Sequence, residues 1–168
     1  MAGNIFLALG SNKRDRLKYI AGAVTMINRS VNCKVVKASS IYETSPYGKT
    51  DQPGFLNCAI QIESDLAPAD LLAFVKKVEF DLGRKNIGEK WGPREIDVDI
   101  IFYNDVIYRG DMMNIPHPES LKRDFVMVPI LELAPEFVHP LLNIRMDEID
   151  LSGIEKHIIR KLDSKIII

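Results

Sequence analysis

The chain has 168 residues, of which 46% are hydrophobic and 27% are charged, as in an ordinary globular protein large enough to bury a core. Its net charge of -1 excludes an overall attraction to nucleic acid or to an acidic membrane, so a bound anion would need a local basic cluster. We therefore expect one domain over residues 1–168.

The N-terminal segment and the cysteines favour a cytoplasmic protein. The apolar run Ile5–Leu9 is too short for a signal peptide or a membrane span, and no basic start precedes it. Cys33 and Cys58 stand alone in apolar stretches without redox or zinc spacing, so we expect two reduced core residues. We expect a cytoplasmic monomer with no membrane partner and no nucleic-acid partner.

The first half of the chain predicts a strand, a helix and two further strands. Ile5–Leu9 is typical of a buried strand, and "GSN" closes it; apolar residues then recur at helical spacing from Leu17 to Ile27. The runs 33–44 and 55–63 are rich in strand-forming residues. Between them, "SPYGKTDQPG" has two prolines and two glycines, which predicts an irregular loop, and its length of ten residues favours a functional one.

The second half begins with a helix from Pro68 to about Gly83, followed by the basic loop "RKNIGEKWGPR" and another strand. This order predicts an α+β, ferredoxin-like βαββαβ fold, with helices packed on an antiparallel sheet. From about Val106 onward we expect a C-terminal extension. It should contain a loop leading into a helix over "IPHPESLKRDF" and a terminal helix over "IEKHIIRKL".

Two aspartates share one face of the strand in "KWGPREIDVDIIFY". Ile96, Val98 and Ile100 should face the core, which turns Asp97 and Asp99 to the other side about 6.7 Å apart. At an effective dielectric constant near 20, two ionised carboxylates would repel by roughly 3 kcal/mol. A Mg²⁺ ion braced by substrate phosphates would offset that repulsion. The alternative is a half-exposed strand whose aspartates face water.

Basic residues surround this strand in the sequence. The preceding glycine-rich loop carries Arg84, Lys85, Lys90 and Arg94, which suit phosphate oxygens, although a charged run is more often a solvated loop. An indole in a polar loop should eventually be buried, so Trp91 favours a functional loop. A second basic set follows, consisting of His117, Lys122 and Arg123.

Other candidates are weaker. Phe55 and Asn57 should share a strand face, where a ring and an amide could hold a flat heterocycle, although Phe on a strand is usually a core residue. Glu79 is either a ligand contact or an edge residue of the second helix. His139 and His157 have no metal-ligand spacing, so we expect them to be structural or exposed.

Six segments occur in the same order as in the 6-hydroxymethyl-7,8-dihydropterin pyrophosphokinases of folate synthesis, and the chain resembles that family over roughly residues 4–140. They are "LALGSN", "SSIYETSPYG", "DQPGFLN", "VEFDLGR", "KWGPREIDVDII" and "IPHPESLKRDFVMVPILELAP". The resemblance implies transfer of the terminal diphosphate of ATP to the pterin hydroxymethyl group, with release of AMP. It also implies two Mg²⁺ ions and ATP as co-substrate.

The resemblance assigns roles to single residues. Asp97 and Asp99 would hold both Mg²⁺ ions, and Arg84 and Arg94 would act with them in catalysis. The implied ATP-binding residues are Glu79, Trp91, Arg94, His117 and Arg123. The implied pterin-binding residues are Thr44, Tyr47, Phe55, Asn57 and Phe125.

Two positions depart from the family pattern. Glu119 follows His-Pro where many relatives have arginine, and Asn86 stands where some relatives carry another arginine. One phosphate contact is therefore absent, while the aspartate pair is kept.

Two other functions compete with this one. A polymerase-like nucleotidyl transferase would also combine this topology with paired aspartates, but it would release pyrophosphate in place of AMP. An RNA-binding sheet would need an aromatic signature that "PGFLNCAI" matches poorly. The near-neutral charge argues against a long nucleic-acid substrate for either.

Overall fold

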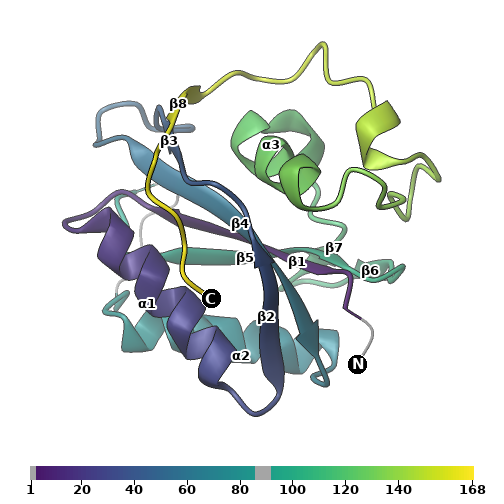
Figure 1. Ribbon diagram of the computed structural model, residues 1–168, viewed down its shortest axis with the longest axis horizontal. Coiled ribbons are helices and arrows are strands. Elements are labelled where there is room, and N and C mark those ends of the chain that lie inside the picture. Colours follow the sequence, from purple (N-terminus) through teal and green to yellow (C-terminus); the bar gives the residue numbers. More distant parts are fainter. Residues whose placement is uncertain (1–2, 86–91) are drawn as a thin grey trace.

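A computed structural model describes residues 3–85 and 92–168 of the chain (Figure 1). Its elements, in chain order, are β1 (Ile5–Ser11), α1 (Arg16–Arg29), β2 (Cys33–Ala38), β3 (Tyr42–Thr44), β4 (Phe55–Ser64), α2 (Pro68–Asp81), β5 (Asp97–Tyr103), β6 (Tyr108–Arg109), β7 (Asn114–Ile115), α3 (Asp124–Leu133) and β8 (Ile158–Lys161). Short 3-10 turns lie at Ser120–Lys122 and Met146–Glu148.

The main sheet has the strand order β5-β1-β4-β3-β8, and β2 also pairs with β4. All of these pairings are antiparallel. One edge of the ten-residue β4 pairs with β1, and the other edge pairs with two strands: β2 along its C-terminal part and β3 along its N-terminal part. The predicted run 33–44 is therefore two strands rather than one.

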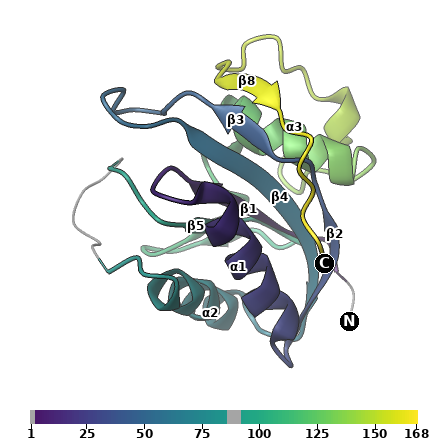
Figure 2. The ribbon, with the colours of Figure 1, turned by 60° about the vertical axis from the view of Figure 1, so that its left-hand side comes forward.

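Helices cover both faces of the sheet. α1 and α2 lie on one face and α3 lies on the other (Figures 1 and 2). Along β1, Ile5, Leu7 and Leu9 pack in the cluster that includes α1 and α2, whereas Phe6 packs in the cluster that includes α3. Burial on both faces explains why this strand has an almost continuous apolar sequence.

Several predictions from the sequence are confirmed. The fold mixes helices with an antiparallel sheet. α1 begins after Asp15, whose side chain accepts a hydrogen bond from the Lys18 amide at 3.1 Å. α2 starts at Pro68, and Gly83 follows its end with a φ of +104°, a conformation that favours glycine. Both cysteines are buried and free. Within the described residues, no helix is both long and apolar enough to cross a membrane.

The predicted terminal helix over 154–162 is wrong. Residues Ile158–Lys161 form β8, which extends the sheet beside β3. The isoleucines in this stretch allow a helical spacing, but the free edge of β3 and the side chain of Asp124 offer hydrogen bonds to an extended chain. Tertiary pairing therefore overrides the local pattern.

Asp124 fastens this terminal strand, so replacing it should loosen the strand. Its Oδ2 atom accepts hydrogen bonds from the amides of His157 and Ile158 at 2.8 and 2.9 Å. We expect Asp124→Ala to lower the free energy of unfolding by about 2 kcal/mol and to speed amide exchange in β8. Urea unfolding and hydrogen exchange would measure this. The exposed Asp163→Ala is the control, and equal protection of β8 in both variants would contradict the assignment.

Candidate functional site

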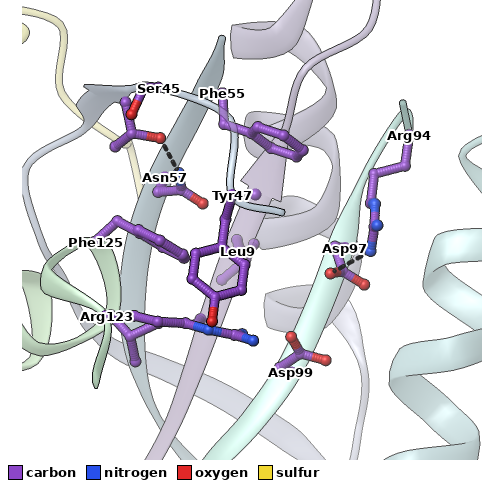
Figure 3. A pocket seen from close by; sticks show the side chains of 14 residues that line it. Leu9, Ser45, Tyr47, Phe55, Asn57, Arg94, Asp97, Asp99, Arg123 and Phe125 are labelled. Atoms are coloured by element: carbon purple, nitrogen blue, oxygen red, sulfur yellow. Dashed lines mark hydrogen bonds and ion pairs between the residues drawn. The ribbon is translucent and has the colours of Figure 1, made fainter. Parts of the chain in front are cut away.

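A pocket opens where β1, β3, β4 and β5 meet the start of α3 (Figure 3). Its lining residues come from all of these elements and from the loops beside them. They are Ala8, Leu9, Gly10, Thr44, Ser45, Tyr47, Phe55, Asn57, Arg94, Asp97, Asp99, Arg123, Phe125 and Val126. The pocket thus joins all five predicted pterin-binding residues to the aspartate pair.

One side of the pocket is aromatic with an amide between the rings. Phe55 and Phe125 project into it from β4 and α3, and Asn57 lies between them (Figure 3). The Asn57 amide donates to the Thr44 hydroxyl at 2.8 Å, which fixes its orientation. Gly10 makes room, since a Cβ there would come within 2.6 Å of the Asn57 Oδ1 atom. This side offers two ring faces and an oriented polar edge.

The other side is charged. Asp97 accepts hydrogen bonds from Arg84 at 2.5 Å and from Arg94 at 2.9 Å, one to each carboxylate oxygen. Asp99 has a weaker ion pair, with Lys76 at 3.9 Å. The predicted compensation of the aspartates by positive charge is therefore present, and it falls mainly on Asp97.

This difference in partners gives the two carboxyl groups different pKa values. Burial alone would raise the pKa of Asp97, but the nearby guanidinium groups of Arg84 and Arg94 outweigh it and hold that pKa below its usual value. Burial and the charge of Asp97 together raise the pKa of Asp99 to about 7. Asp97 is a stable anion, whereas Asp99 carries uncompensated charge when it ionises.

Glu79, on α2, contacts residues of this charged side. Its side chain is 4% exposed and accepts hydrogen bonds from the Val98 amide at 2.7 Å and from Lys76 at 2.8 Å. It also forms an ion pair with Arg84 at 2.8 Å. Its pKa is raised by burial, against the opposing charge of Lys76. The structure therefore makes Glu79 a link between α2 and β5, and it does not line the pocket in Figure 3.

A second pocket lies next to Asp99. Asp99 lines both cavities, and the second one extends from it toward α2 and the segment before α3. Its lining residues are Leu72, Lys76, Asp99, Ile100, Asp111, Met112, Met113, Asn114, His117 and Pro118. The structure thus places His117 with the second pocket and Arg123 with the first.

His117 is ready to donate a hydrogen bond there. Its Nδ1 atom accepts from the Glu119 amide at 3.2 Å, which leaves Nε2 to carry the proton of the neutral ring. Burial, followed by the positive charge of Arg123, lowers its pKa. Glu119 itself forms an ion pair with Lys122 at 3.4 Å.

Asn12 was missed by the sequence analysis, where "GSN" indicated only the end of a strand. Its backbone amide donates to the Arg94 carbonyl and its Oδ1 accepts from the Arg94 amide, at 3.2 and 2.9 Å. Its side-chain amide donates to Gln52 and to the Pro53 carbonyl, each at 3.0 Å. One buried side chain therefore ties the loop before β5 to the loop before β4.

Trp91 and His157 are two other residues considered in the sequence. Trp91 lies outside the described residues, so its predicted role at ATP stays a prediction. His157 was expected to be structural or exposed. Its ring packs against Tyr47 and Phe125, which form an aromatic wall of the pocket, and it does not line the pocket itself. Its position depends on the terminal strand that the sequence analysis assigned to a helix.

Comparisons with known sequences identify a family. The model of the 7,8-dihydro-6-hydroxymethylpterin-pyrophosphokinase (HPPK) family matches residues 6–135. A 2-amino-4-hydroxy-6-hydroxymethyldihydropteridine pyrophosphokinase of Aquifex aeolicus is 41% identical over 137 residues, which is 82% of this chain and 84% of that protein. The protein of the same name from Bacillus subtilis is 39% identical over 131 residues, or 78% of each chain.

Longer relatives also match. A folic acid synthesis protein of Dictyostelium discoideum is 40% identical over 153 residues, which cover 90% of this chain but only 23% of that protein. The crystal structure of wild-type Plasmodium falciparum HPPK-DHPS with pterin and p-hydroxybenzoate has a TM-score of 0.66 and 16% identity. The match covers 88% of this chain and 41% of that one. At such identity, the likeness concerns the fold alone.

The raised pKa of Asp99 predicts that the stability of the folded protein depends on pH. With a pKa of about 7 in the folded protein, Asp99 holds a proton that the unfolded chain releases near pH 4, so stability falls as the pH rises between these values. Without divalent cations, Asp99→Asn should remove this fall. We expect a gain of about 1 kcal/mol at pH 8, kept small by solvent screening because the side chain is 35% exposed.

Urea unfolding in EDTA from pH 4.5 to pH 8 would measure the effect, as the difference between variant and wild type at each pH. Asp105→Asn, an exposed carboxyl beyond the end of the same strand, is the matched control. If Asp99→Asn and the control followed the same pH profile as the wild type, the raised pKa would be refuted.

Proposed function

This chain belongs to the 7,8-dihydro-6-hydroxymethylpterin-pyrophosphokinase family, and from that membership we propose that it catalyses the family reaction. The terminal diphosphate of ATP is transferred to the hydroxymethyl group of 6-hydroxymethyl-7,8-dihydropterin, and AMP is released. The product then serves folate biosynthesis, the process named for several of the relatives.

The observation that carries this proposal is the position of Asp99 between two pockets. A reaction that joins a flat heterocycle to a nucleotide needs one cavity for each substrate and a charged group where they meet. The aromatic pocket suits the heterocycle, and the second pocket suits the nucleotide. Their common boundary is the aspartate face of β5.

The pterin fits the aromatic side. We propose that its ring stacks between Phe55 and Phe125, where offset contact of aromatic faces is favourable. Asn57 then reads the edge of the ring, together with backbone groups near Thr44 and Tyr47. This orientation directs the hydroxymethyl group toward Asp97 and Asp99.

The nucleotide occupies the second pocket, with its phosphates next to the shared aspartate. His117 can donate from Nε2, and Arg94 and Arg123 offer guanidinium groups from the first pocket. Glu79 acts on this substrate indirectly, since it holds Lys76 and Arg84 by ion pairs. We propose Trp91 as a further ATP contact on the family resemblance alone.

The residues present also fit Mg²⁺. The described part of the chain has no cluster of three or more His, Cys, Asp or Glu side chains that could hold a metal. Mg²⁺ in phosphoryl transfer, however, is usually held by one or two carboxylates together with substrate phosphates. The pKa of Asp99, raised by burial and then by the charge of Asp97, supports such an ion, because a bound cation would offset the cost of ionising this carboxyl group. We propose that Asp97 and Asp99 hold two Mg²⁺ ions.

In the proposed reaction, the pterin hydroxyl attacks the β-phosphorus and the bond to the α-phosphate oxygen breaks, so that AMP leaves. Bound Mg²⁺ would supply neutralisation of the phosphate charge. The chain would supply positioning and electrostatic stabilisation: the aromatic pocket would orient the hydroxyl, and Arg84 and Arg94, which donate to Asp97, would stabilise the charge that develops. Such transfer needs little help from a strong base.

The proposal also covers the sheet topology, the oligomeric state and the cellular location. The order β5-β1-β4-β2, with α1 and α2 on one face, supports the ferredoxin-like βαββαβ arrangement expected from the sequence. We propose a single domain that acts as a monomer. A cytoplasmic location stays a prediction.

The reaction can be tested by its products. We expect the purified chain with Mg-ATP and 6-hydroxymethyl-7,8-dihydropterin to form AMP and a diphosphorylated pterin in equal amounts, separated by ion-exchange chromatography. Release of pyrophosphate would favour the nucleotidyl transferase instead. A folded sample that forms no AMP above the pterin-free control would refute the proposed reaction.

The role of the aspartate face can be tested by a charge change without a large change in shape. We expect Asp97→Asn to lower kcat at least 100-fold, roughly the loss expected when one electrostatic contact in a preorganised site is removed. Asp105→Asn, which removes a carboxylate of the same sign beyond the end of β5, should keep wild-type turnover. Near-normal kcat for a folded Asp97→Asn protein would contradict the assignment.

A further inference from the structure

The C-terminal segment of the chain, beyond the residues that the family model matches, returns to the proposed pterin pocket. The match ends at residue 135, whereas β8 lies at 158–161 and pairs with β3 (Figures 1 and 2). In this pairing Ile158 lies opposite Thr44, which lines the pocket. The terminal segment therefore borders the substrate pocket from outside.

His157, the residue just before β8, is fixed at this border from two directions. Its carbonyl accepts from the Ser45 amide at 2.9 Å, and its Nδ1 lies 3.0 Å from the Ser45 hydroxyl. Its own amide donates to Asp124 at the start of α3, at 2.8 Å. The residue thus bridges the loop after β3 and the helix on the other side of the pocket.

The imidazole ring completes an aromatic cluster. Its centroid lies 5.4 Å from the ring of Tyr47 and 5.7 Å from that of Phe125, both in edge geometry. Tyr47 and Phe125 are themselves 6.0 Å apart, and both line the pocket, whereas His157 does not. Its side chain is 19% exposed, so the ring is largely packed.

Tyr47 also contacts a cation. The guanidinium carbon of Arg123 stands 4.5 Å from the centroid of the Tyr47 ring. Tyr47 therefore contacts both Arg123, which lines the pocket, and His157, which does not. Without the imidazole, Tyr47 and Phe125 would lose a common neighbour and could shift into the space behind the wall.

We propose that His157 is a positioning residue that holds the Tyr47–Phe125 wall in place and thereby sets the affinity for the pterin ring. The inference rests on the proposed function, since it takes the ligand of the aromatic pocket to be the pterin. It gives the terminal segment, which lies outside the residues matched by the family model, a role in pterin binding. His157 touches the wall and takes no part in the transfer itself.

The test compares three substitutions. His157→Ala removes the ring, His157→Asn keeps a hydrogen-bonding group for Ser45 without the ring, and His157→Phe keeps an aromatic ring without the hydrogen bond. We expect Ala and Asn to raise the Kd and the KM for pterin roughly tenfold, the size of one aromatic contact, while Phe stays close to wild type. kcat and the KM for ATP should not change in any of them.

Ile159→Ala is the control, because this side chain lies on the same strand and is 66% exposed.

Direct pterin binding without turnover, measured by equilibrium dialysis, separates the two proposals. A wild-type protein that does not bind pterin would overturn the proposed function and the inference with it. Wild-type binding with unchanged affinity in His157→Ala, or a loss in His157→Phe equal to that in His157→Ala, would overturn only the role of His157. A parallel loss in kcat and in ATP affinity would also overturn it, because that pattern indicates general damage to the fold.

Discussion

The site depends on an incomplete balance of charge around two aspartates. Arg84 is shared between Glu79 and Asp97, and Arg94 adds a second cation to Asp97. Asp99 pairs with Lys76 at 3.9 Å, and Lys76 also pairs with Glu79 at 2.8 Å. Fully neutralised carboxylates would have little use for a further cation, and fully exposed ones would be screened by water. The arrangement keeps one stable anion beside one that becomes costly when it ionises. We regard this residual charge as the feature that prepares the site for a metal and phosphates.

The register of the sheet sets the distance between the two halves of the site. Gly10 on β1 pairs with Asn57 on β4 and with Asp97 on β5, so the amide and the carboxylate stand at the same level on either side of it. With adjacent strands about 4.8 Å apart, the backbones of these two residues are about 10 Å apart. A glycine between them leaves the face of the sheet open. Backbone hydrogen bonding therefore sets the distance between the proposed pterin site and the aspartates.

Local patterns predicted two pairs of residues in this site, and the family resemblance added Thr44, Tyr47 and Phe125. Alternation in "REIDVDII" placed Asp97 and Asp99 on one face, and the spacing in "GFLNC" placed Phe55 and Asn57 together, because a strand has a period of two. Asn12 could not be found this way, since its partners lie 40 or more residues along the chain. His157 was expected to be structural or exposed, but its place beside the pocket could not be predicted, because it depends on an edge strand that forms only when β3 offers unpaired backbone groups.

The central claim is that the aspartate face of β5 lies between the two substrates. The most direct measurement is a crystal structure with Mn²⁺ in place of Mg²⁺, a non-hydrolysable ATP analogue and the pterin, with anomalous scattering to locate the metal. The account predicts anomalous density next to both Asp97 and Asp99, with the pterin between Phe55 and Phe125 and the phosphates on the His117 side. Both substrates bound with no metal at these carboxylates, or with the pterin outside the aromatic pocket, would contradict it.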